Sequence, residues 1–294
     1  MTREVIKLNI PYEKFDCKKD DISANLTVFD DIDYEEDQFE TCEKRPAVIV
    51  CPGGAYFFLC EREAEPIARE FAKNGVRPFL LEYSVLPNKF PAALMEVAQA
   101  IRYVREHSEE LGVDKDRILV SGSSAGGHLA ASIGTLWNEP FLSEVLGVSA
   151  ETIRPNGIIL SYPVITAGEY THLDSCVNLV GDHTLEGDEA RRAFTEKQEY
   201  FKYISLENQV DKDSAKTFIW TTLDDTLVPM ENSMLFVKAL RDVKVPVEFH
   251  LFPYRDHGMS LANEAASRDE LKNDVDPYIA RWFPWAIEWI KKMI

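Results

Sequence analysis

Cysteine is scarce in this sequence and shows no pattern of pairs. There are five cysteines, and none of them stands in a C-x-x-C motif. An odd number without that motif predicts neither a disulfide framework nor a zinc ribbon. No apolar run reaches the roughly 18 residues that a membrane-spanning helix needs, and residues 1–20 lack the apolar core of a signal peptide. We therefore expect a reduced, cytoplasmic protein that has no membrane partner.

Positive charge is also in short supply. The chain has 32 Lys and Arg residues against 50 Asp and Glu residues, which gives a formal net charge of -18. Such a surface repels a phosphate backbone, so we expect no nucleic-acid partner. Residues 30–43 contain eight of the acidic groups and no basic one. This segment is predicted to be an exposed loop or an edge hairpin.

What the sequence does contain is a regular alternation of strand and helix patterns over 294 residues, of which 45% are hydrophobic. Residues 47–51 form a continuous apolar run, typical of a strand buried on both faces. The alternation predicts an α/β fold with a mostly parallel central sheet covered by helices on both faces. Strands are predicted at 4–10, 23–29, 47–51, 76–83, 117–122, 156–162, 216–222 and 246–252. Helices are predicted near 64–74, 91–107, 125–137 and 230–241, with a last one beginning near Asp276-Pro277.

Residues 163–215 interrupt this alternation. They contain a weakly periodic helix near 188–203 and little other pattern. An insert of this length between strands is typical of a lid or a substrate wall, with a decorative excursion as the alternative. We expect a single domain over 1–294 with this insert as its lid.

The stretch Gly122-Ser123-Ser124-Ala125-Gly126 fits the pattern G-x-S-x-G. It lies between a predicted strand and a predicted helix, which is the setting that a nucleophilic serine needs. The serine must project from a sharp, strained turn, and the residues two before and two after it crowd that turn. Ser124 is therefore the candidate nucleophile, beside a helix N-terminus that favours negative charge. The alternative is a tight turn of small residues.

A serine hydroxyl needs a base, and the base needs an acid to orient it. In the order that belongs with this motif, the acid and then the histidine follow the serine. His257, in the loop after the last predicted strand, is the candidate base. His128, one turn into the helix after Ser124, is expected to pack or to form a hydrogen bond, and His250, within a strand, to be a packed or a surface histidine. Asp225 is the candidate acid, with Asp224 as its rival and helix capping as the alternative role for either.

A glycine-rich turn follows an early strand in the stretch VIVCPGGAYFF, residues 48–58. Glycines allow a backbone to approach a substrate closely and to turn its N–H groups toward it. An oxyanion hole is predicted from the N–H groups of Gly54, Ala55 and Ala125. The aromatic residues that follow are candidates for lining the acyl side, with core packing as the alternative: Tyr56, Phe57 and Phe58.

At these residues the chain resembles the α/β-hydrolase superfamily over nearly its whole length. It is most similar to hormone-sensitive-lipase-like and to acetyl-xylan-esterase and feruloyl-esterase-like carboxylesterases. The matching stretches are CPGGAYFF, REAEPIAREFAKNGVRPFLLEYSVLP, FPAALMEVAQAIRYVRE, SGSSAGGHLAAS, TLDDTLVPMENSMLF and HLFPYRDHGMSLA. The resemblance implies a Ser124–His257–Asp225 triad, no metal or organic cofactor, and small acyl esters as substrates, including esters on sugars.

The chain departs from the family at the oxyanion turn, where many relatives have H-G-G-G. Pro52 takes the place of the histidine and Ala55 that of the last glycine. Backbone donors survive this change, but side-chain contacts from the motif do not. Some relatives carry a glycanase name. Glycoside hydrolysis needs two carboxylates that flank the scissile bond. No such pair is evident in the sequence, so we do not expect glycanase activity.

The sequence thus predicts a serine carboxylesterase that acts on a small acyl ester, most simply an acetyl ester, on a carbohydrate. One alternative is a peptidase of the prolyl-oligopeptidase type, although the 46 residues before the first core strand cannot form a propeller. Another is a non-catalytic binding protein on the same fold. The sequence does not decide whether the protein forms a homo-oligomer. Four aromatic residues near the C-terminus could lie in an interface, but we expect them to pack in the core: Trp282, Phe283, Trp285 and Trp289.

Overall fold

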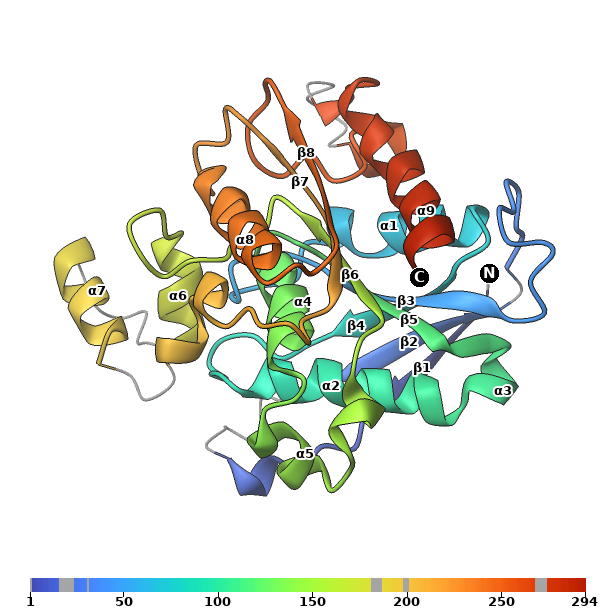
Figure 1. The fold of residues 1–294 in the computed structure, drawn as a ribbon, viewed down its shortest axis with the longest axis horizontal. Helices are drawn as coiled ribbons and strands as arrows, with labels where there is room; N and C mark the ends of the chain where they lie inside the picture. Colours follow the sequence, from blue (N-terminus) through green and yellow to red (C-terminus); the bar gives the residue numbers. More distant parts are fainter. Residues whose placement is uncertain (1, 16–23, 31, 181–186, 198–200, 268–273) are drawn as a thin grey trace.

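The computed structural model describes residues 2–15, 24–30, 32–180, 187–197, 201–267 and 274–294. Eight strands in these ranges form one sheet in the order β1-β2-β4-β3-β5-β6-β7-β8 (Figure 1). β2 pairs antiparallel with β1 and β4, whereas all neighbours from β4 to β8 pair in parallel. The predicted mostly parallel sheet is confirmed. The strands are β1 Thr2–Lys7, β2 Asn25–Asp30, β3 Arg45–Cys51, β4 Arg77–Glu82, β5 Val113–Ser123, β6 Gly157–Ser161, β7 Lys216–Thr222 and β8 Val247–Phe252.

Helices cover both faces of the sheet, and each face has its own hydrophobic core. The α-helices are α1 Glu65–Lys73, α2 Ala92–Glu106, α3 Ser108–Leu111, α4 Ser124–Leu136, α5 Pro140–Leu146, α6 Leu173–Val180, α7 Asp188–Thr195, α8 Glu231–Asp242 and α9 Trp282–Met293. Single 3-10 turns are η1 Tyr12–Lys14, η3 Glu61–Glu63, η4 Ala150–Ile153, η5 Phe201–Tyr203, η6 Leu206–Asn208, η7 Glu264–Ala266 and η9 Ile279–Arg281.

Residues 47–51 of β3 are hydrophobic throughout because both faces of the strand are buried. Ala47, Ile49 and Cys51 belong to the core beneath α2, α4 and α8, while Val48 and Val50 belong to the core beneath α1 and α9. Successive side chains of a strand point to opposite faces, so a strand covered on both sides has no place for a polar residue. The run therefore identifies a central strand.

The parallel strands end together at one edge of the sheet. Cys51 of β3 pairs with Gly122 of β5, and Ser123 of β5 pairs with Ser161 of β6. The loops that leave these carboxyl ends therefore begin side by side. Loops at this edge are where α/β sheets place their ligands.

The C-terminal helix α9 packs on the sheet through its aromatic side chains. Trp282, Phe283 and Trp289 are buried in the core, and Trp285 is half-buried. This confirms the preferred prediction of core packing. Asp276 accepts backbone hydrogen bonds from Tyr278 and Ile279, as a residue that starts a helical turn does.

The acidic segment before β3 is a loop. This agrees with one of the two predictions for residues 30–43, an exposed loop or an edge hairpin. Asp37 forms an ion pair with Arg45, whose guanidinium lies 3.8 Å from the ring centre of Tyr34. This pairing holds the pKa of Asp37 below its usual value. Residues 23 and 31, at the edges of a predicted strand and of this loop, lie outside the described residues.

The insert between β6 and β7 differs from its prediction. It carries α6, Leu173–Val180, which the sequence analysis missed, and α7 ends at Thr195. The predicted helix over 188–203 is therefore too long, and residues 198–200 lie outside the described part of the chain. α6 has only 8 residues, which is shorter than the roughly 11–18 residues over which a helical period is read from a sequence. In Figure 1, α6 and α7 lie at one end of the molecule.

None of the helices in the described ranges is long and apolar enough to cross a membrane. The cytoplasmic location, the single-domain boundary and the lid stay predictions.

Candidate active site

Ser124 stands at the sharp turn where β5 ends and α4 begins. Its φ of 53° is in the left-handed region, a strained conformation for a residue with a side chain. A Cβ atom on Gly122 would come within 2.0 Å of the Gly126 carbonyl oxygen, and one on Gly126 within 2.1 Å of the Cys51 carbonyl oxygen. The steric need for glycine on both sides of the turn is therefore confirmed.

The structure brings Ser124, His257 and Asp225 together from three loops at the carboxyl edge of the sheet. The Ser124 hydroxyl lies 2.9 Å from His257 Nε2, and His257 Nδ1 lies 2.7 Å from Asp225 Oδ2. The Tyr162 ring packs edge-on against the imidazole at a centroid distance of 4.9 Å. This geometry lets Nδ1 donate to the carboxylate while Nε2 accepts the serine proton.

Asp225 faces the candidate base, and it does not cap α8, whose N-cap residue is Met230. Its Oδ2 faces His257, while its Oδ1 accepts the backbone N–H groups of Leu227 (3.0 Å) and Val228 (2.8 Å). The side chain is buried, whereas the neighbouring rival Asp224 is exposed. The loop that leads to α8 therefore fixes the carboxylate against the histidine.

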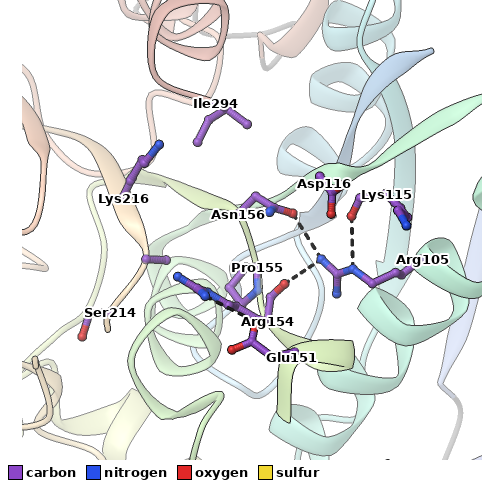
Figure 2. A pocket seen from close by; sticks show the side chains of 11 residues that line it. Arg105, Lys115, Asp116, Glu151, Arg154, Pro155, Asn156, Ser214, Lys216 and Ile294 are labelled. Carbon is purple, nitrogen blue, oxygen red and sulfur yellow. Dashed lines mark hydrogen bonds and ion pairs between the residues drawn. The ribbon is translucent and has the colours of Figure 1, made fainter. Parts of the chain in front are cut away.

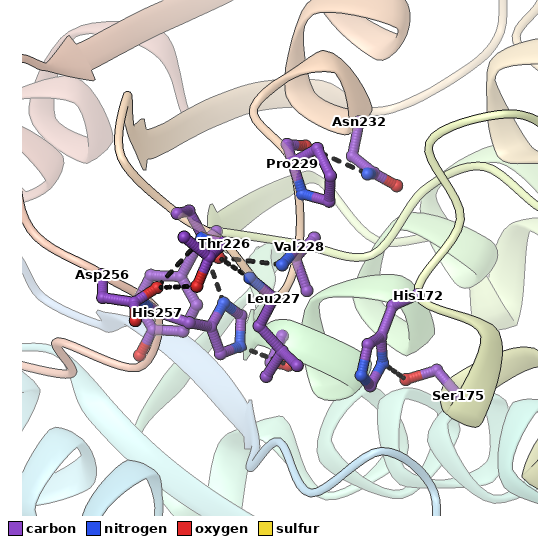
Figure 3. Close-up of polar contacts among 12 residues, drawn as sticks. His172, Ser175, Thr226, Leu227, Val228, Pro229, Asn232, Asp256 and His257 are labelled. Atoms are coloured by element: carbon purple, nitrogen blue, oxygen red, sulfur yellow. Dashed lines mark hydrogen bonds and ion pairs between the residues drawn. The ribbon is translucent and has the colours of Figure 1, made fainter.

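Asp256, next to the histidine in sequence, is a site residue that the sequence analysis missed. Its Oδ1 accepts hydrogen bonds from Thr226 N, Thr226 Oγ1 and His257 N, each 2.9 Å long (Figure 3). The backbone hydrogen bond from Thr226 is the main cause that holds the pKa of this carboxyl below its usual value. Asp256 thus ties the loop of Asp225 to the loop of His257.

The glycine-rich turn after β3 lies against Ser124. Gly53 donates its N–H to Glu63 Oε2 at 2.9 Å, so this amide is already occupied. Gly54 (φ 128°) and Ala55 (φ 54°) both line the cleft with Ser124. Ala125 is buried in the first turn of α4, where N–H groups have no partner within the helix.

Tyr56, Phe57 and Phe58, which follow this turn, have different environments. Tyr56 is buried, and its hydroxyl donates to His128 Nδ1 at 2.9 Å, while His128 Nε2 donates to the carbonyl of Ile204. Burial lowers the pKa of His128 to about 4. Phe57 is exposed and does not line the cleft, whereas Phe58 does. The structure therefore does not bring Tyr56 or Phe57 to the cleft.

The cause is the backbone of the turn. Tyr56 follows Ala55 with a second positive φ, 56°, which directs its side chain under the loop. A periodicity argument cannot anticipate such a turn, because the conformation is set by the packing beneath it.

The insert between β6 and β7 supplies one wall of the cleft. Asn178 of α6 donates to the Ala55 carbonyl oxygen at 2.9 Å. His172, just before α6, lines the cleft beside Ser124 and His257. Nothing in the sequence pattern indicates that His172 lies on the cleft wall.

The cleft has a volume of about 530 Å³ and mixes apolar and polar surfaces. Phe58 and Leu227 line it with more than two fifths of each residue exposed. Cys60 also lines it, but burial, followed by the charge of Glu63, raises the pKa of its thiol, so it is not a thiolate that could rival the serine. Among the described residues no group of three His, Cys, Asp or Glu side chains is placed to hold a metal ion.

A second hollow, of about 500 Å³, lies near the amino-terminal ends of β6 and β7 (Figure 2). Its Arg105 donates to the backbone carbonyls of Lys115, Thr152 and Arg154 and to the side chain of Asn156. The described residues that line this hollow include no histidine or cysteine. Its polar groups bind one another, and it carries no chemistry comparable to that of the cleft.

This sheet, with a serine elbow, a histidine and an acid at its carboxyl edge, defines an α/β hydrolase. A solved structure, the acetyl ester-xyloside bifunctional hydrolase from Caldicellulosiruptor lactoaceticus, has the same architecture with a TM-score of 0.75 and 33% sequence identity. The alignment covers 98% of this chain and 95% of that chain. The predicted fold class is confirmed.

The chain belongs to the BD-FAE family, whose model matches residues 34–240. Endo-1,4-beta-xylanase B of Butyrivibrio fibrisolvens is 36% identical over 232 residues, which are 75% of this chain and 33% of that protein. An acetylxylan esterase of Xylanibacter ruminicola is 26% identical over 237 residues, 79% of this chain and 45% of that protein. The chain thus spans less than half the length of these curated relatives. The resemblance read from the sequence is confirmed.

Proposed function

We propose that this chain is a serine carboxylesterase that hydrolyses small acyl esters, acetyl esters first among them, carried on a carbohydrate. The observation that carries the proposal is the hydrogen-bonded line from Ser124 Oγ to His257 Nε2 (2.9 Å) and from His257 Nδ1 to Asp225 Oδ2 (2.7 Å). A serine is a weak nucleophile unless such a base takes its proton.

In this mechanism His257 takes the proton of Ser124 as the serine oxygen attacks the ester carbonyl. The negative oxygen that forms is stabilised by the N–H groups of Gly54, Ala55 and Ala125. His257 then gives its proton to the leaving alcohol, and an acyl-enzyme remains on Ser124. A water molecule, deprotonated by His257, releases the acid and restores the serine.

The carbohydrate part of the proposal is supported by the relatives, since one is named an acetylxylan esterase and a solved neighbour an acetyl ester-xyloside bifunctional hydrolase. Glycoside hydrolysis is disfavoured by the carboxylates of the cleft. Glu63 uses both oxygens to accept hydrogen bonds from Gly53 and Tyr162, and Asp256 accepts three from the loops of the acid and the base. Both carboxylates thus have partners within the protein, whereas glycoside hydrolysis needs two carboxylates that flank the scissile bond.

The test is the variant Ser124→Ala assayed on p-nitrophenyl acetate and on acetylated xylo-oligosaccharides. We expect activity to fall to background while circular dichroism and the melting temperature stay those of the parent. Ser143→Ala, on the surface helix α5, is the matched control and should retain activity. Retained activity in Ser124→Ala would overturn the proposal.

Two further assays separate the alternatives. A fluorophosphonate probe should label the folded parent and not Ser124→Ala; absence of labelling would favour a non-catalytic binding protein. Faster cleavage of proline-containing dipeptidyl substrates than of acetyl esters would favour a peptidase. A preference for long acyl chains would contradict the carbohydrate part alone.

A further inference from the structure

We propose that His172 is a specificity-determining residue that binds a hydroxyl group on the alcohol part of the ester. The cleft would then prefer acetyl esters of polyhydroxylated alcohols to acetyl esters of plain ring alcohols of the same size. This inference rests on the proposed esterase function and assigns a substrate contact to the insert between β6 and β7.

The first observation is the position of His172. It lines the cleft together with Ser124, Leu227 and His257, and Figure 3 shows it across from Leu227. In the proposed reaction His257 Nε2 hands its proton to the leaving alcohol, so the alcohol oxygen lies next to that nitrogen. The side chains that flank His257 in the cleft are therefore the ones that meet the rest of the alcohol.

The second observation is that the ring is held in place from within the protein. His172 Nδ1 lies 2.8 Å from the hydroxyl of Ser175, which is buried. Fixing one ring nitrogen fixes the ring orientation, as it does for histidines that bind ligands elsewhere. Nε2 is the nitrogen that remains for the cleft.

The backbone before His172 is anchored by a fully buried amide of α8. Asn232 Oδ1 accepts the N–H groups of Ile165 (2.9 Å) and Thr166 (3.1 Å), and its Nδ2 donates to the carbonyl of Tyr170 (2.8 Å). The loop that carries His172 is thereby tied to the helix that follows the Asp225 loop. A side chain that selects substrates must be held in position by hydrogen bonds of this kind from the residues behind it.

The chemistry of the ring suits a hydroxyl group. Burial lowers the pKa of His172, against the opposing effect of the Asp174 charge, so the imidazole is neutral at neutral pH. A neutral imidazole has one donor and one acceptor nitrogen, and Ser175 occupies one of them. Nε2 is left as a donor or an acceptor, and a hydroxyl group of the substrate can meet either, because it both donates and accepts. An alcohol without further hydroxyl groups offers no partner.

The test compares an acetylated methyl xyloside with cyclohexyl acetate, whose ring is of similar size and carries no hydroxyl group. His172→Phe keeps a ring and removes both nitrogens. We expect it to lower kcat/KM for the xyloside ester about three- to tenfold more than for cyclohexyl acetate, the effect of one lost hydrogen bond. His172→Gln, which restores a donor and an acceptor near the Nε2 position, should recover most of the loss. His107→Phe, at a half-buried histidine that follows α2 and does not line the cleft, is the matched control.

Equal losses on both esters, or no loss on either, would overturn the inference, since His172 would then support the site without reading the alcohol. A parent protein that cleaves cyclohexyl acetate but not the acetylated xyloside would also overturn it and leave the esterase function standing. A parent that cleaves neither of these esters nor p-nitrophenyl acetate would overturn both proposals.

Discussion

The hydroxyl of Tyr162 donates a hydrogen bond of 2.7 Å to the buried carboxylate of Glu63, 99 residues away in the chain. The other oxygen of Glu63 accepts the N–H of Gly53 in the glycine-rich turn. The Tyr162 hydroxyl in turn accepts the N–H of Ser260, three residues after His257. Two side chains thus connect the turn proposed to bind the oxyanion with the loop of the proposed base.

We predict that Tyr162→Phe loosens this connection. The change leaves the N–H of Ser260, which is fully buried, without its partner, at a cost of about 1–3 kcal/mol of unfolding free energy. Because the Tyr162 ring also packs on His257, we expect kcat/KM for p-nitrophenyl acetate to fall about tenfold through a displaced base. Urea unfolding and steady-state kinetics measure the two effects. Tyr254→Phe, at an exposed tyrosine, is the control, and parent-like values in Tyr162→Phe would contradict the prediction.

The second prediction separates Asp225 from Asp224. In Asp225→Asn the amide oxygen can still accept from Leu227 and Val228, but the amide nitrogen then faces His257 Nδ1 and donates to it. The imidazole is forced to carry its proton on Nε2, where it cannot accept the serine proton, and kcat should fall on the order of 10⁴-fold. Asp224→Asn changes an exposed side chain and should stay within about twofold of the parent. The reverse ranking in esterase assays would assign the acid to Asp224.

Local sterics explain why the serine turn could be read from the sequence. The turn between β5 and α4 demands glycine at fixed offsets, and the order of the serine, the acid and the histidine follows the order of the strands. The β3 run could be read for a similar reason, because a strand covered on both faces has only apolar neighbours.

The connections between loops could not be read from the sequence. Glu63 meets Tyr162, and Asn232 meets the start of the insert, only because the strands end in register at one edge of the sheet. Asp256 carried a weak local signal, an aspartate directly before the candidate base, yet its partner Thr226 lies 30 residues away. Nothing in the spacing of these residues encodes the pairing, which is a property of the assembled sheet.

The third prediction concerns Gly126. A Cβ atom there would lie 2.1 Å from the carbonyl oxygen of Cys51 and 2.4 Å from that of Pro52, and both are backbone atoms that cannot rotate away. Gly126→Ala should therefore separate the nucleophile turn from the oxyanion turn, destabilise the fold by about 1–3 kcal/mol and abolish esterase activity. Gly147→Ala is the control: its φ of 67° is strained for alanine, but nothing lies within 4 Å. It should cost about 1–2 kcal/mol and leave kcat/KM unchanged.

The last prediction concerns Glu96 of α2, a fully buried carboxyl remote from the proposed chemistry. Its oxygens lie 2.6 Å from both the N–H and the hydroxyl of Ser84 and 2.7 Å from the hydroxyl of Tyr12. Burial raises its pKa from 4.5 to about 7. The folded protein therefore holds this proton more tightly than the unfolded chain does. The stability that Glu96 contributes is full below pH 4.5 and is lost as the pH rises through 7.

Glu96→Gln imitates the protonated carboxyl, since an amide also offers one acceptor and one donor to these partners. Between pH 5 and pH 8 the unfolding free energy of the parent, measured by urea denaturation, should fall relative to that of Glu96→Gln by roughly 2.5 kcal/mol, at about 1.4 kcal/mol per unit of pKa. Glu82→Gln, at an exposed position of β4, should follow the parent across this range. A constant difference between the parent and Glu96→Gln would show that Glu96 does not change its protonation there. Because Tyr12 lies in η1, the same titration should loosen the amino-terminal segment first, which hydrogen exchange of residues 2–15 can measure.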